Sequence, residues 1–401
     1  MHGLMQDHPL LISSLIRHAA ANHGGREVVS RLGDGSIHRT DYATIERRAR
    51  RLAQTLERQG IRPGDRIATL AWNSYRHVEC FYGVLRRGAG LTPVYPRLFH
   101  AQIAYIIRHA EDRVLIFDAD LLSIVEKIAP EISCVERYVV LTDRAGLPAS
   151  EVLELVAYED WIAAAGDDYA WPEFDERAAS SLCYTSGTTG NPKGVLYSHR
   201  STLIHAFSVG QADSFALSSL DTVMPIAPLF HANGWSLPYA CPMVGARMVL
   251  PGNHMDAASL HELLAGERVT FAVGVPTIWT MLLAYMAEQG VKLTALDRCL
   301  VAGTALPPAV RKALKETHGV TAIHAWGMTE TSPIGTISTP TPEVLALPEG
   351  EREAQLLKQG RVPFGSEIQV RDAEGRVAPK NGETFGPLWI RGPWIASGYF
   401  K

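Results

Sequence analysis

The sequence predicts an α/β protein with two stacked α/β layers, each a mainly parallel sheet with helices, and a small β-barrel-like unit near its C-terminal end. Strand-like and helix-like hydrophobic patterns alternate over residues 41–142 and again over residues 181–327, which indicates the two layers. Short apolar runs separated by the turn signals DAEG and KNGE over residues 366–392 indicate the barrel-like unit. The expected subdomains cover about residues 1–175, 176–345 and 346–401.

The first layer begins with an amphipathic helix. Its apolar residues recur at helical spacing from Tyr42 to Leu56, and Gly60 ends the pattern. Beyond it, strands and helices alternate as in a parallel sheet covered by helices. The expected strands cover residues 66–72, 91–96, 113–118 and 137–142, and the expected helices cover residues 75–90, 101–111 and 121–132.

The second layer follows a polar connector at residues 166–180. It repeats the alternation, which again favours a parallel sheet. The expected strands cover residues 181–186, 221–229, 271–275, 299–303 and 322–327, and the expected helices cover residues 202–210, 260–269, 277–290 and 308–319.

Composition and charge exclude several classes of protein. A hydrophobic content of 46% with 20% charged residues is typical of a soluble globular chain, and a net charge of -4 gives no reason to expect nucleic acid or an anionic membrane as partner. The local basic run Arg47, Arg48, Arg50 and Arg51 reads as a solvated helix face. Five scattered cysteines without a C-x-x-C argue against a disulfide framework or structural zinc and fit a reducing cytoplasm. No apolar run approaches the roughly 18 residues of a membrane span, and the N-terminus lacks the order of a signal peptide.

The segment YTSGTTGNPKG, residues 184–194, has the composition of a phosphate-binding loop. It is not a Walker loop, because Gly194 follows Lys193 where that motif has Ser or Thr, and residues 195–199 look extended where it has a helix. The backbone amides of Gly187 to Gly190 can still form an anion-binding nest. The glycines alone fit a flexible surface turn equally well.

The complete string resembles the phosphate loop of the adenylate-forming superfamily, which includes acyl-CoA synthetases, firefly luciferase and the adenylation domains of peptide synthetases. Further segments resemble other motifs of that family, in family order, so that the resemblance covers about the whole chain. These segments are PLFHANGW from Pro228, VAGTALPP from Val301, AWGMTETSP from Ala325, GRVPFGSEI from Gly360 and GPLWIRGPWIASGYFK from Gly386.

The resemblance implies the fold of an acyl-CoA synthetase N-terminal domain and a reaction in two steps. A carboxylate attacks the α-phosphate of ATP to give an acyl-adenylate and pyrophosphate, and a thiol, usually that of coenzyme A, then displaces AMP. Lys193 would supply a positive charge that stabilises the leaving pyrophosphate, and Thr329 would donate a hydrogen bond to the α-phosphate. Glu330 would bind Mg²⁺, with the hydroxyl of Thr185 as a candidate second ligand. The implied phosphate loop comprises Thr185, Ser186, Gly187, Thr188, Thr189 and Gly190.

The resemblance also implies an adenine site. Gly303 and Thr304 would let the base approach the backbone, and Trp326 would stack on it where the family commonly has tyrosine. His324, Ala325 and Gly327 complete the implied nucleotide-binding set, with Ala325 standing where many relatives have glycine. Each of these roles has a structural alternative. Lys193 can be a solvated surface lysine, Thr329–Glu330 an ordinary helix start, and Trp326 a core tryptophan.

The implied acid site lies around PLFHANGW. His231 would contact the substrate carboxylate or gate the thioester step, although a lone histidine there also fits the core. No acidic residue follows Phe230 in this segment, so an α-ammonium would be unpaired, and amino acids are disfavoured. Phe230 and Trp235 resemble the fatty-acyl pattern in which tryptophan guards an acyl tunnel. Residues that can line that tunnel, or equally a hydrophobic core, are Phe271, Val273, Val275 and Ile278.

PLLISSLIRHAA and HAWGMTETSP resemble the medium- and long-chain fatty-acid branch, which includes the ligases acting on methylthiopropionate. Acyl length cannot be read from the sequence. Alternatives are an adenylate-forming enzyme with a luciferase-type or carrier-protein second step, and a non-catalytic sensor. The family's ribose-binding aspartate and adenylating lysine would follow SGYFK, so we expect this chain to be the large N-terminal domain, to bind nucleotide weakly and to turn over little. Relatives in this branch are often homodimers.

Overall fold

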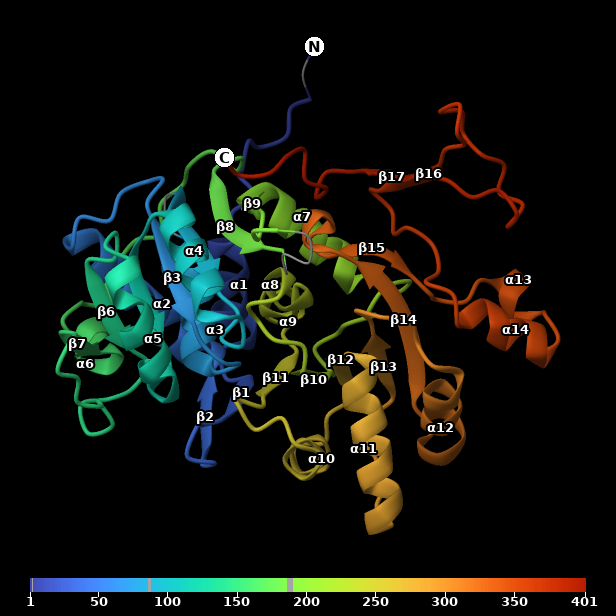
Figure 1. Ribbon diagram of the computed structural model, residues 1–401, viewed down its shortest axis with the longest axis horizontal. Helices are drawn as coiled ribbons and strands as arrows, with labels where there is room; N and C mark the ends of the chain where they lie inside the picture. Colours follow the sequence, from blue (N-terminus) through green and yellow to red (C-terminus); the bar gives the residue numbers. More distant parts are fainter. Residues whose placement is uncertain (2, 86–87, 186–189) are drawn as a thin grey trace.

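The computed structural model describes residues 1, 3–85, 88–185 and 190–401, and it contains two sheets whose strands are mainly parallel (Figure 1). The seven-stranded sheet has the order β7-β6-β5-β3-β4-β8-β9, and only β9 runs antiparallel to its neighbour. Its strands are β3 (Arg66–Leu70), β4 (Gly90–Pro93), β5 (Asp112–Phe117), β6 (Arg137–Val140), β7 (Leu155–Ala157), β8 (Ala179–Tyr184) and β9 (Gly194–Ser198).

The eight-stranded sheet has the order β15-β14-β13-β12-β10-β11-β1-β2, with antiparallel strands only at its two edges. Its strands are β1 (Glu27–Arg31), β2 (Ile37–Asp41), β10 (Thr222–Pro225), β11 (Arg247–Leu250), β12 (Phe271–Gly274), β13 (Arg298–Val301), β14 (Thr321–Gly327) and β15 (Ile334–Ile337). The predicted stacking of two mainly parallel α/β layers is confirmed.

Helices form three layers around these sheets. One hydrophobic cluster joins the outer face of the seven-stranded sheet to α4 (His100–Ala110) and α5 (Leu122–Ile128). Another joins the eight-stranded sheet to its outer helices, and a third fills the space between the sheets. The outer helices of the eight-stranded sheet are α10 (Ala257–Gly266), α11 (Pro276–Gln289) and α12 (Pro308–His318); the third cluster draws on α1 (Ser13–His23), α2 (Tyr42–Arg58), α3 (Tyr75–Gly83), α6 (Tyr158–Ala163), α7 (His199–Gly210) and α9 (Leu237–Val244).

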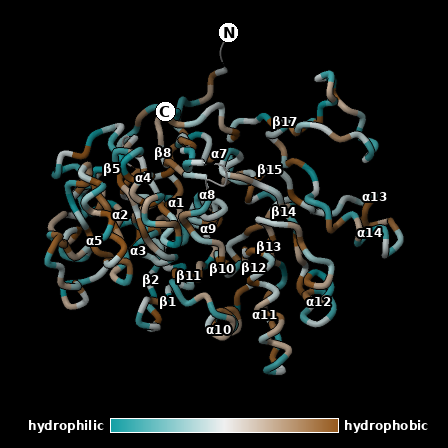
Figure 2. The backbone as a smooth tube through the Cα atoms, in the orientation of Figure 1, coloured by the Kyte–Doolittle hydropathy of each residue, from teal (hydrophilic) through white to brown (hydrophobic). Residues whose placement is uncertain are grey.

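Strand periodicity explains why the eight-stranded sheet separates the cluster between the sheets from the cluster on its outer helices. Val28 packs between the sheets, whereas the next residue, Val29, packs on the outer helices, and the same alternation relates Leu300 to Val301. Successive side chains of a strand point to opposite faces, so a strand buried on both faces is apolar throughout. Hydrophobic residues accordingly concentrate where the strands and inner helices lie, while peripheral loops are mostly hydrophilic (Figure 2).

Helix α2 shows how the local sequence starts an element. Asp41 is its N-cap, and the Asp41 carboxylate accepts a hydrogen bond of 2.7 Å from the backbone amide of Thr44. Its arginine run is not a uniformly solvated face, so that prediction is wrong for Arg48. The Arg48 guanidinium lies 2.6 Å from the carboxylate of Glu79, which is fully buried. Arginine can extend its polar head past an apolar surface, and a charge count alone cannot show where that head ends.

The eight-stranded sheet is built from two separate parts of the chain, and the seven-stranded sheet comes from the part between them. Hairpin β1–β2 comes from the first 41 residues yet lies in the eight-stranded sheet, and β8–β9 joins the seven-stranded sheet after the polar connector. The division expected near residue 175 therefore stays a prediction about subdomains and is not a boundary between sheets.

The C-terminal tail contains the expected antiparallel strands but no closed barrel among the described residues. Strands β16 (Glu367–Val370) and β17 (Leu388–Arg391) form a two-stranded ribbon. Two strands of four residues each cannot close on themselves, so the barrel-like expectation is corrected to a ribbon. Helices α13 (Pro342–Leu345) and α14 (Glu349–Leu356) precede it. Within the described parts of the chain, we find no helix with the length and apolar character needed to cross a bilayer.

Candidate active site

The glycine-rich segment connects β8 to β9. The Thr185 amide donates to the Lys193 carbonyl at 3.0 Å, and the Lys193 amide donates to the Thr185 hydroxyl at 3.1 Å. These two bonds close the base of the loop. The chain continues as strand β9, and helix α7 begins at His199 after the N-cap Ser198, so the predicted difference from a Walker loop is confirmed. Ser186, Gly187, Thr188 and Thr189 lie outside the described residues.

Gly190, three residues before Lys193 in this loop, has φ = 117°, a conformation that glycine adopts without strain. Lys193 is exposed next to it, and its Nζ lies 4.9 Å from the ring centroid of Tyr399. The expected pyrophosphate lysine is therefore held at the protein surface by an aromatic ring from the C-terminal tail.

The second motif forms the turn between β14 and β15. Thr329 is buried, and its carbonyl accepts a hydrogen bond of 2.5 Å from the hydroxyl of Tyr197 on β9. Glu330 is half-buried, and its Oε1 accepts a hydrogen bond of 2.6 Å from the Tyr399 hydroxyl. Tyr197 and Tyr399 thus tie this turn to the loop region, and the two motifs meet although about 135 residues separate them.

The residues present fit the expected Mg²⁺. No group of three His, Cys, Asp or Glu side chains that could hold a metal occurs in the part of the chain that the structure describes. Mg²⁺ bound with nucleotide usually takes one or two protein carboxylates and fills its other positions with phosphate and water. Glu330 supplies one such carboxylate, and Thr185 supplies a hydroxyl at the loop base.

The expected adenine site lies where β13 and β14 end side by side. Gly303 follows β13 with φ = 93°, and a Cβ there would lie 3.2 Å from Cγ1 of Val275. Thr304 is exposed beside it. Trp326 is half-buried on β14, and its indole packs directly over Gly335 of β15, where an added Cβ would overlap the ring. One face of the indole is therefore covered by backbone.

Two members of the expected nucleotide set have buried side chains. The His324 imidazole lies with Nδ1 2.7 Å from the Leu357 carbonyl, at the end of α14. Ala325 belongs to the hydrophobic cluster between the sheets. Only their backbone is left to face a ligand, together with Gly327, at which an added Cβ would overlap the Pro333 carbonyl.

The segment after Phe230 has an unusual backbone. Helix α8 (Ala232–Trp235) is a left-handed turn, with φ of 40° at Ala232, 46° at Asn233 and 56° at Trp235. Non-glycine residues adopt this region at a cost of roughly 1–2 kcal/mol each, and such strain is concentrated at functional sites. The Asn233 side chain donates to the Ser181 hydroxyl on β8, which helps to hold the turn.

This turn directs neighbouring side chains to opposite sides. His231 is exposed, and the surrounding protein desolvates its imidazole and lowers the pKa of His231 below its usual value. Trp235 is buried in the cluster between the sheets. Phe230 stacks on Tyr95, with ring centroids 4.7 Å apart and planes 18° apart.

Phe230 borders an apolar pocket of about 330 Å³. Ile278 also lines this pocket, as expected, whereas Trp235 and Val275 do not. Val275 is 40% exposed and lies against Gly303 at the expected adenine site instead. Phe271 packs on Phe215 in the core. The complete lining is Trp72, Asn73, Tyr95, Arg97, Ile226, Pro228, Phe230, Gly252, Met255, Thr277, Ile278 and Met281.

The three tyrosines that organise this site received no role from the sequence. Tyr399 lies in SGYFK, inside a segment that resembles a family motif, so its position was a usable signal. Tyr95 and Tyr197 lie in or beside short strands whose apolar character reads equally well as core.

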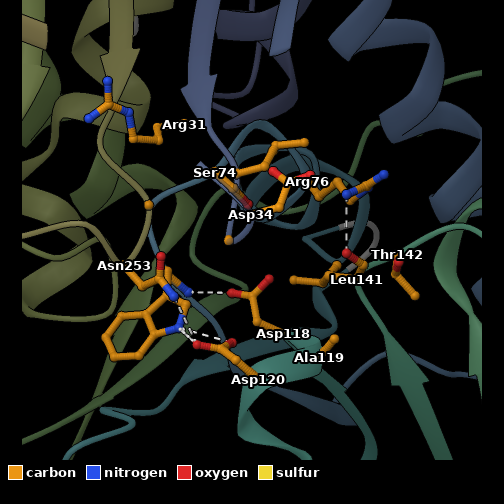
Figure 3. Close-up of a pocket in the computed structure, with 14 residues that line it drawn as sticks. Arg31, Asp34, Ser74, Arg76, Asp118, Ala119, Asp120, Leu141, Thr142 and Asn253 are labelled. Atoms are coloured by element: carbon orange, nitrogen blue, oxygen red, sulfur yellow. Dashed lines mark hydrogen bonds between the residues drawn. The ribbon is translucent and has the colours of Figure 1, made fainter. Parts of the chain in front are cut away.

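A second pocket of about 330 Å³ opens where β3, β5 and β6 end (Figure 3). Asp118 accepts a hydrogen bond of 2.7 Å from the Trp72 amide, and Asp120 accepts from the Trp72 indole and from Asn253. Trp72 also borders the apolar pocket, so the two cavities are neighbours. Burial raises the pKa of Asp118 to about 7, and the adjacent Asp120 charge adds to this shift.

This raised pKa makes a prediction about stability. A carboxyl with a folded pKa near 7 and an ordinary unfolded pKa near 4 stabilises the fold fully below about pH 4, and that contribution is lost as the pH rises to about 7. Asp118→Asn keeps an acceptor for the Trp72 amide and removes the titration. We expect the free energy of unfolding of the wild type to fall relative to Asp118→Asn by roughly 2 kcal/mol between pH 4 and 8, after allowance for solvent screening. Urea denaturation of both proteins at several pH values checks this, and parallel pH profiles would contradict it.

Comparison with known proteins agrees with this geometry. The model of a family described as AMP-binding enzyme matches residues 16–400. The 3-methylmercaptopropionyl-CoA ligase of Ruegeria pomeroyi is 46% identical over 401 residues, which are 100% of this chain and 74% of that protein. The medium-chain-fatty-acid–CoA ligase of Ectopseudomonas oleovorans is 44% identical over 400 residues, with 100% and 73% of the two chains covered.

Solved structures show the same fold. An anthranilate CoA ligase in complex with anthranoyl-AMP superimposes with a TM-score of 0.84 at 25% identity, covering 98% of this chain and 73% of that chain. The resemblance stated from the motifs is confirmed. This chain belongs to the AMP-binding enzyme family.

Proposed function

We propose that the protein activates a fatty or other apolar carboxylic acid with ATP through an acyl-adenylate and transfers the acyl group to coenzyme A. The observation that carries this proposal is the pocket beside Phe230. None of the described residues that line it is acidic, and most are apolar or aromatic. An amino acid would leave its ammonium group unpaired there, whereas an alkyl chain gains from leaving water.

The charged groups support the adenylation step. Lys193 offers an ammonium to the pyrophosphate that leaves, and Thr329 at the buried turn offers a donor to the α-phosphate. Glu330 and Thr185 would hold Mg²⁺, which would neutralise phosphate charge when it is bound. Because hydrogen bonds already fix the loop base and the turn, these groups need little rearrangement when charge develops.

His231 supports the handling of the acid. Its lowered pKa keeps the exposed imidazole neutral near pH 7, so it can donate one hydrogen bond and accept another. Next to Phe230, His231 would orient the substrate carboxylate or act as a gate at the thioester-forming step.

The indole of Trp326 would form one wall of the adenine site, and Gly335 sets its position. Gly335→Ala would place a methyl group against the indole and displace it. We expect AMP binding to weaken by roughly 3- to 10-fold, the magnitude of one lost aromatic stack. Gly266→Ala is the matched control, because a Cβ at that position meets nothing within 4 Å. Calorimetric titration of both variants checks this, and unchanged affinity in Gly335→Ala would remove Trp326 from the site.

A second candidate substrate is 3-methylthiopropionate. The 46% identical relative is named for that acid, and two thioether side chains, Met255 and Met281, line the pocket with a soft, adaptable surface. The cytoplasmic location and the homodimer expected from the sequence stay predictions.

The decisive experiment measures acid-dependent AMP release with straight-chain acids of increasing length and with methylthiopropionate, each with and without coenzyme A. It is run on this chain and on a form extended to the full length of its relatives, of which this chain covers 74% and 73% in the two ligases compared above. Turnover that requires coenzyme A and shows an optimum in acid length supports the proposal. AMP release independent of coenzyme A favours a luciferase-type or carrier-protein second step, and no turnover with any acid in either form contradicts the fatty-acyl assignment.

A further inference from the structure

The tail residues that end the described chain return to the site and dock on both motifs. The Ala396 amide donates to the Glu330 carbonyl at 2.8 Å, and the Phe400 amide donates to the Gly194 carbonyl at 2.8 Å. The Phe400 ring packs edge-on against His109, with centroids 5.9 Å apart, and Arg66 covers it at 5.5 Å. Figure 1 shows this end of the chain beside β8 and β9. Tyr399 is therefore fixed by anchors on either side of it.

Tyr399 lies between two opposite charges. Its hydroxyl donates to Oε1 of Glu330 at 2.6 Å, and its ring centroid lies 4.9 Å from Nζ of Lys193. Among the described residues, Lys193 and Glu330 form no ion pair with each other; each contacts this one phenol instead. The side chain itself is 49% exposed, so it contributes little to the core.

The alternative to this arrangement is a direct pair. A lysine and a glutamate on one surface attract each other, and their long side chains can meet if nothing separates them. Such a pair would occupy the ammonium needed by pyrophosphate and the carboxylate needed by a divalent cation. The phenol takes one lone pair of the carboxylate and contacts the ammonium only through its ring face, so most donors and acceptors of both groups stay available.

We propose that Tyr399 is a positioning residue, a spacer that keeps Lys193 and Glu330 apart and oriented before Mg²⁺ and ATP bind. This inference rests on the proposed function, because it assigns both charged groups to the nucleotide. It makes the ring the essential part of Tyr399 and the hydroxyl a smaller contributor.

The test is a double-mutant cycle for binding of Mg²⁺ with a non-hydrolysable ATP analogue to the 401-residue chain, followed by calorimetry. Tyr399→Ala is expected to weaken binding about 10-fold, and Tyr399→Phe, which keeps the ring, by less than about threefold. In a Glu330→Gln background no pair can form, so Tyr399→Ala is expected to have almost no further effect. Phe400→Leu loosens the same tail without touching either charge and serves as the matched control.

The outcomes separate the explanations. An equal penalty for Tyr399→Ala in both backgrounds, or an equal penalty for Phe400→Leu, would mean that Tyr399 only docks the tail and would overturn the spacer. If the wild type binds the analogue and Tyr399→Ala binds it equally well, the spacer fails while the proposed function stands. If neither this chain nor a form extended to the full length of its relatives binds the analogue, the proposed function fails and the spacer fails with it. Thermal unfolding of each variant confirms that the fold is retained.

Discussion

Glu330→Gln is expected to lower kcat for acid-dependent AMP formation by about two to three orders of magnitude. Glutamine keeps the shape of the side chain and can still accept from the Tyr399 hydroxyl, so the turn between β14 and β15 should stay folded. It removes the negative charge that would hold Mg²⁺, and the oxygen of a neutral amide binds this hard cation far less well than a carboxylate.

The measurement is the initial rate of AMP release over a range of Mg²⁺ concentrations, on the form extended to the full length of its relatives and with the acid that gives the fastest turnover. The Mg²⁺ dependence should move to higher concentration as kcat falls, which separates a metal role from simple loss of fold. Glu343→Gln, an exposed glutamate in α13, is the matched control. A Glu330→Gln variant with the wild-type rate and Mg²⁺ dependence would remove this residue from the reaction.

Arg48→Met is expected to destabilise the protein by about 3–5 kcal/mol, because it leaves the buried carboxylate of Glu79 without its charged partner. Glu79 is fully buried, with one carboxylate oxygen 2.6 Å from Arg48 and the other 2.9 Å from the Tyr158 hydroxyl. Burial raises the pKa of Glu79, so loss of Arg48 would leave only the phenol against that burial and drive the carboxyl toward its neutral form.

Arg47→Met on the same helix is the matched control, since Arg47 is exposed and its guanidinium donates to the nearby Thr44 hydroxyl at 3.1 Å. Urea denaturation of both variants should show a large loss of stability for Arg48→Met and a small one for Arg47→Met. Adding Glu79→Gln to Arg48→Met should restore part of the loss, because no charge is then left unpaired. Similar losses for the two arginine variants would refute this account of the cluster.

The sequence was sufficient for elements whose signal is local. Helix α2 was expected from Tyr42 to a stop at Gly60 and occurs at Tyr42–Arg58, because its apolar spacing and its final glycine lie within one segment. Strands β1, β2, β7, β11 and β15 were not expected from the sequence. β2 is partly exposed along its length and lacks a clear alternation, and β1 is specified by pairing with β11, about 220 residues away. Such a pairing leaves no pattern in a short window.

The candidate site shows the same limit. Motif order indicated Lys193 and Glu330, but not that one tyrosine contacts both. In ANGW the Asn233–Gly234 pair favours positive φ, but nothing indicates that Ala232 and Trp235 share this conformation, because local propensity opposes it there. Trp235, at the end of that turn, lies in the core, whereas Phe230, just before the turn, borders the apolar pocket. Whether Trp235 acts at an acyl tunnel stays a prediction.

The origin of the eight-stranded sheet in two separate parts of the chain bears on how the protein is made. A nascent chain that has left the ribosome as far as residue 210 contains every strand of the seven-stranded sheet, but its hairpin β1–β2 still lacks β11. The hairpin must wait for about 40 further residues, and the apolar side chain of Val29 is uncovered in the meantime, because the rest of its cluster begins at Met224. Synthesis therefore passes through a stage in which every strand of one sheet has been made while the first hairpin still lacks its neighbour in the other sheet.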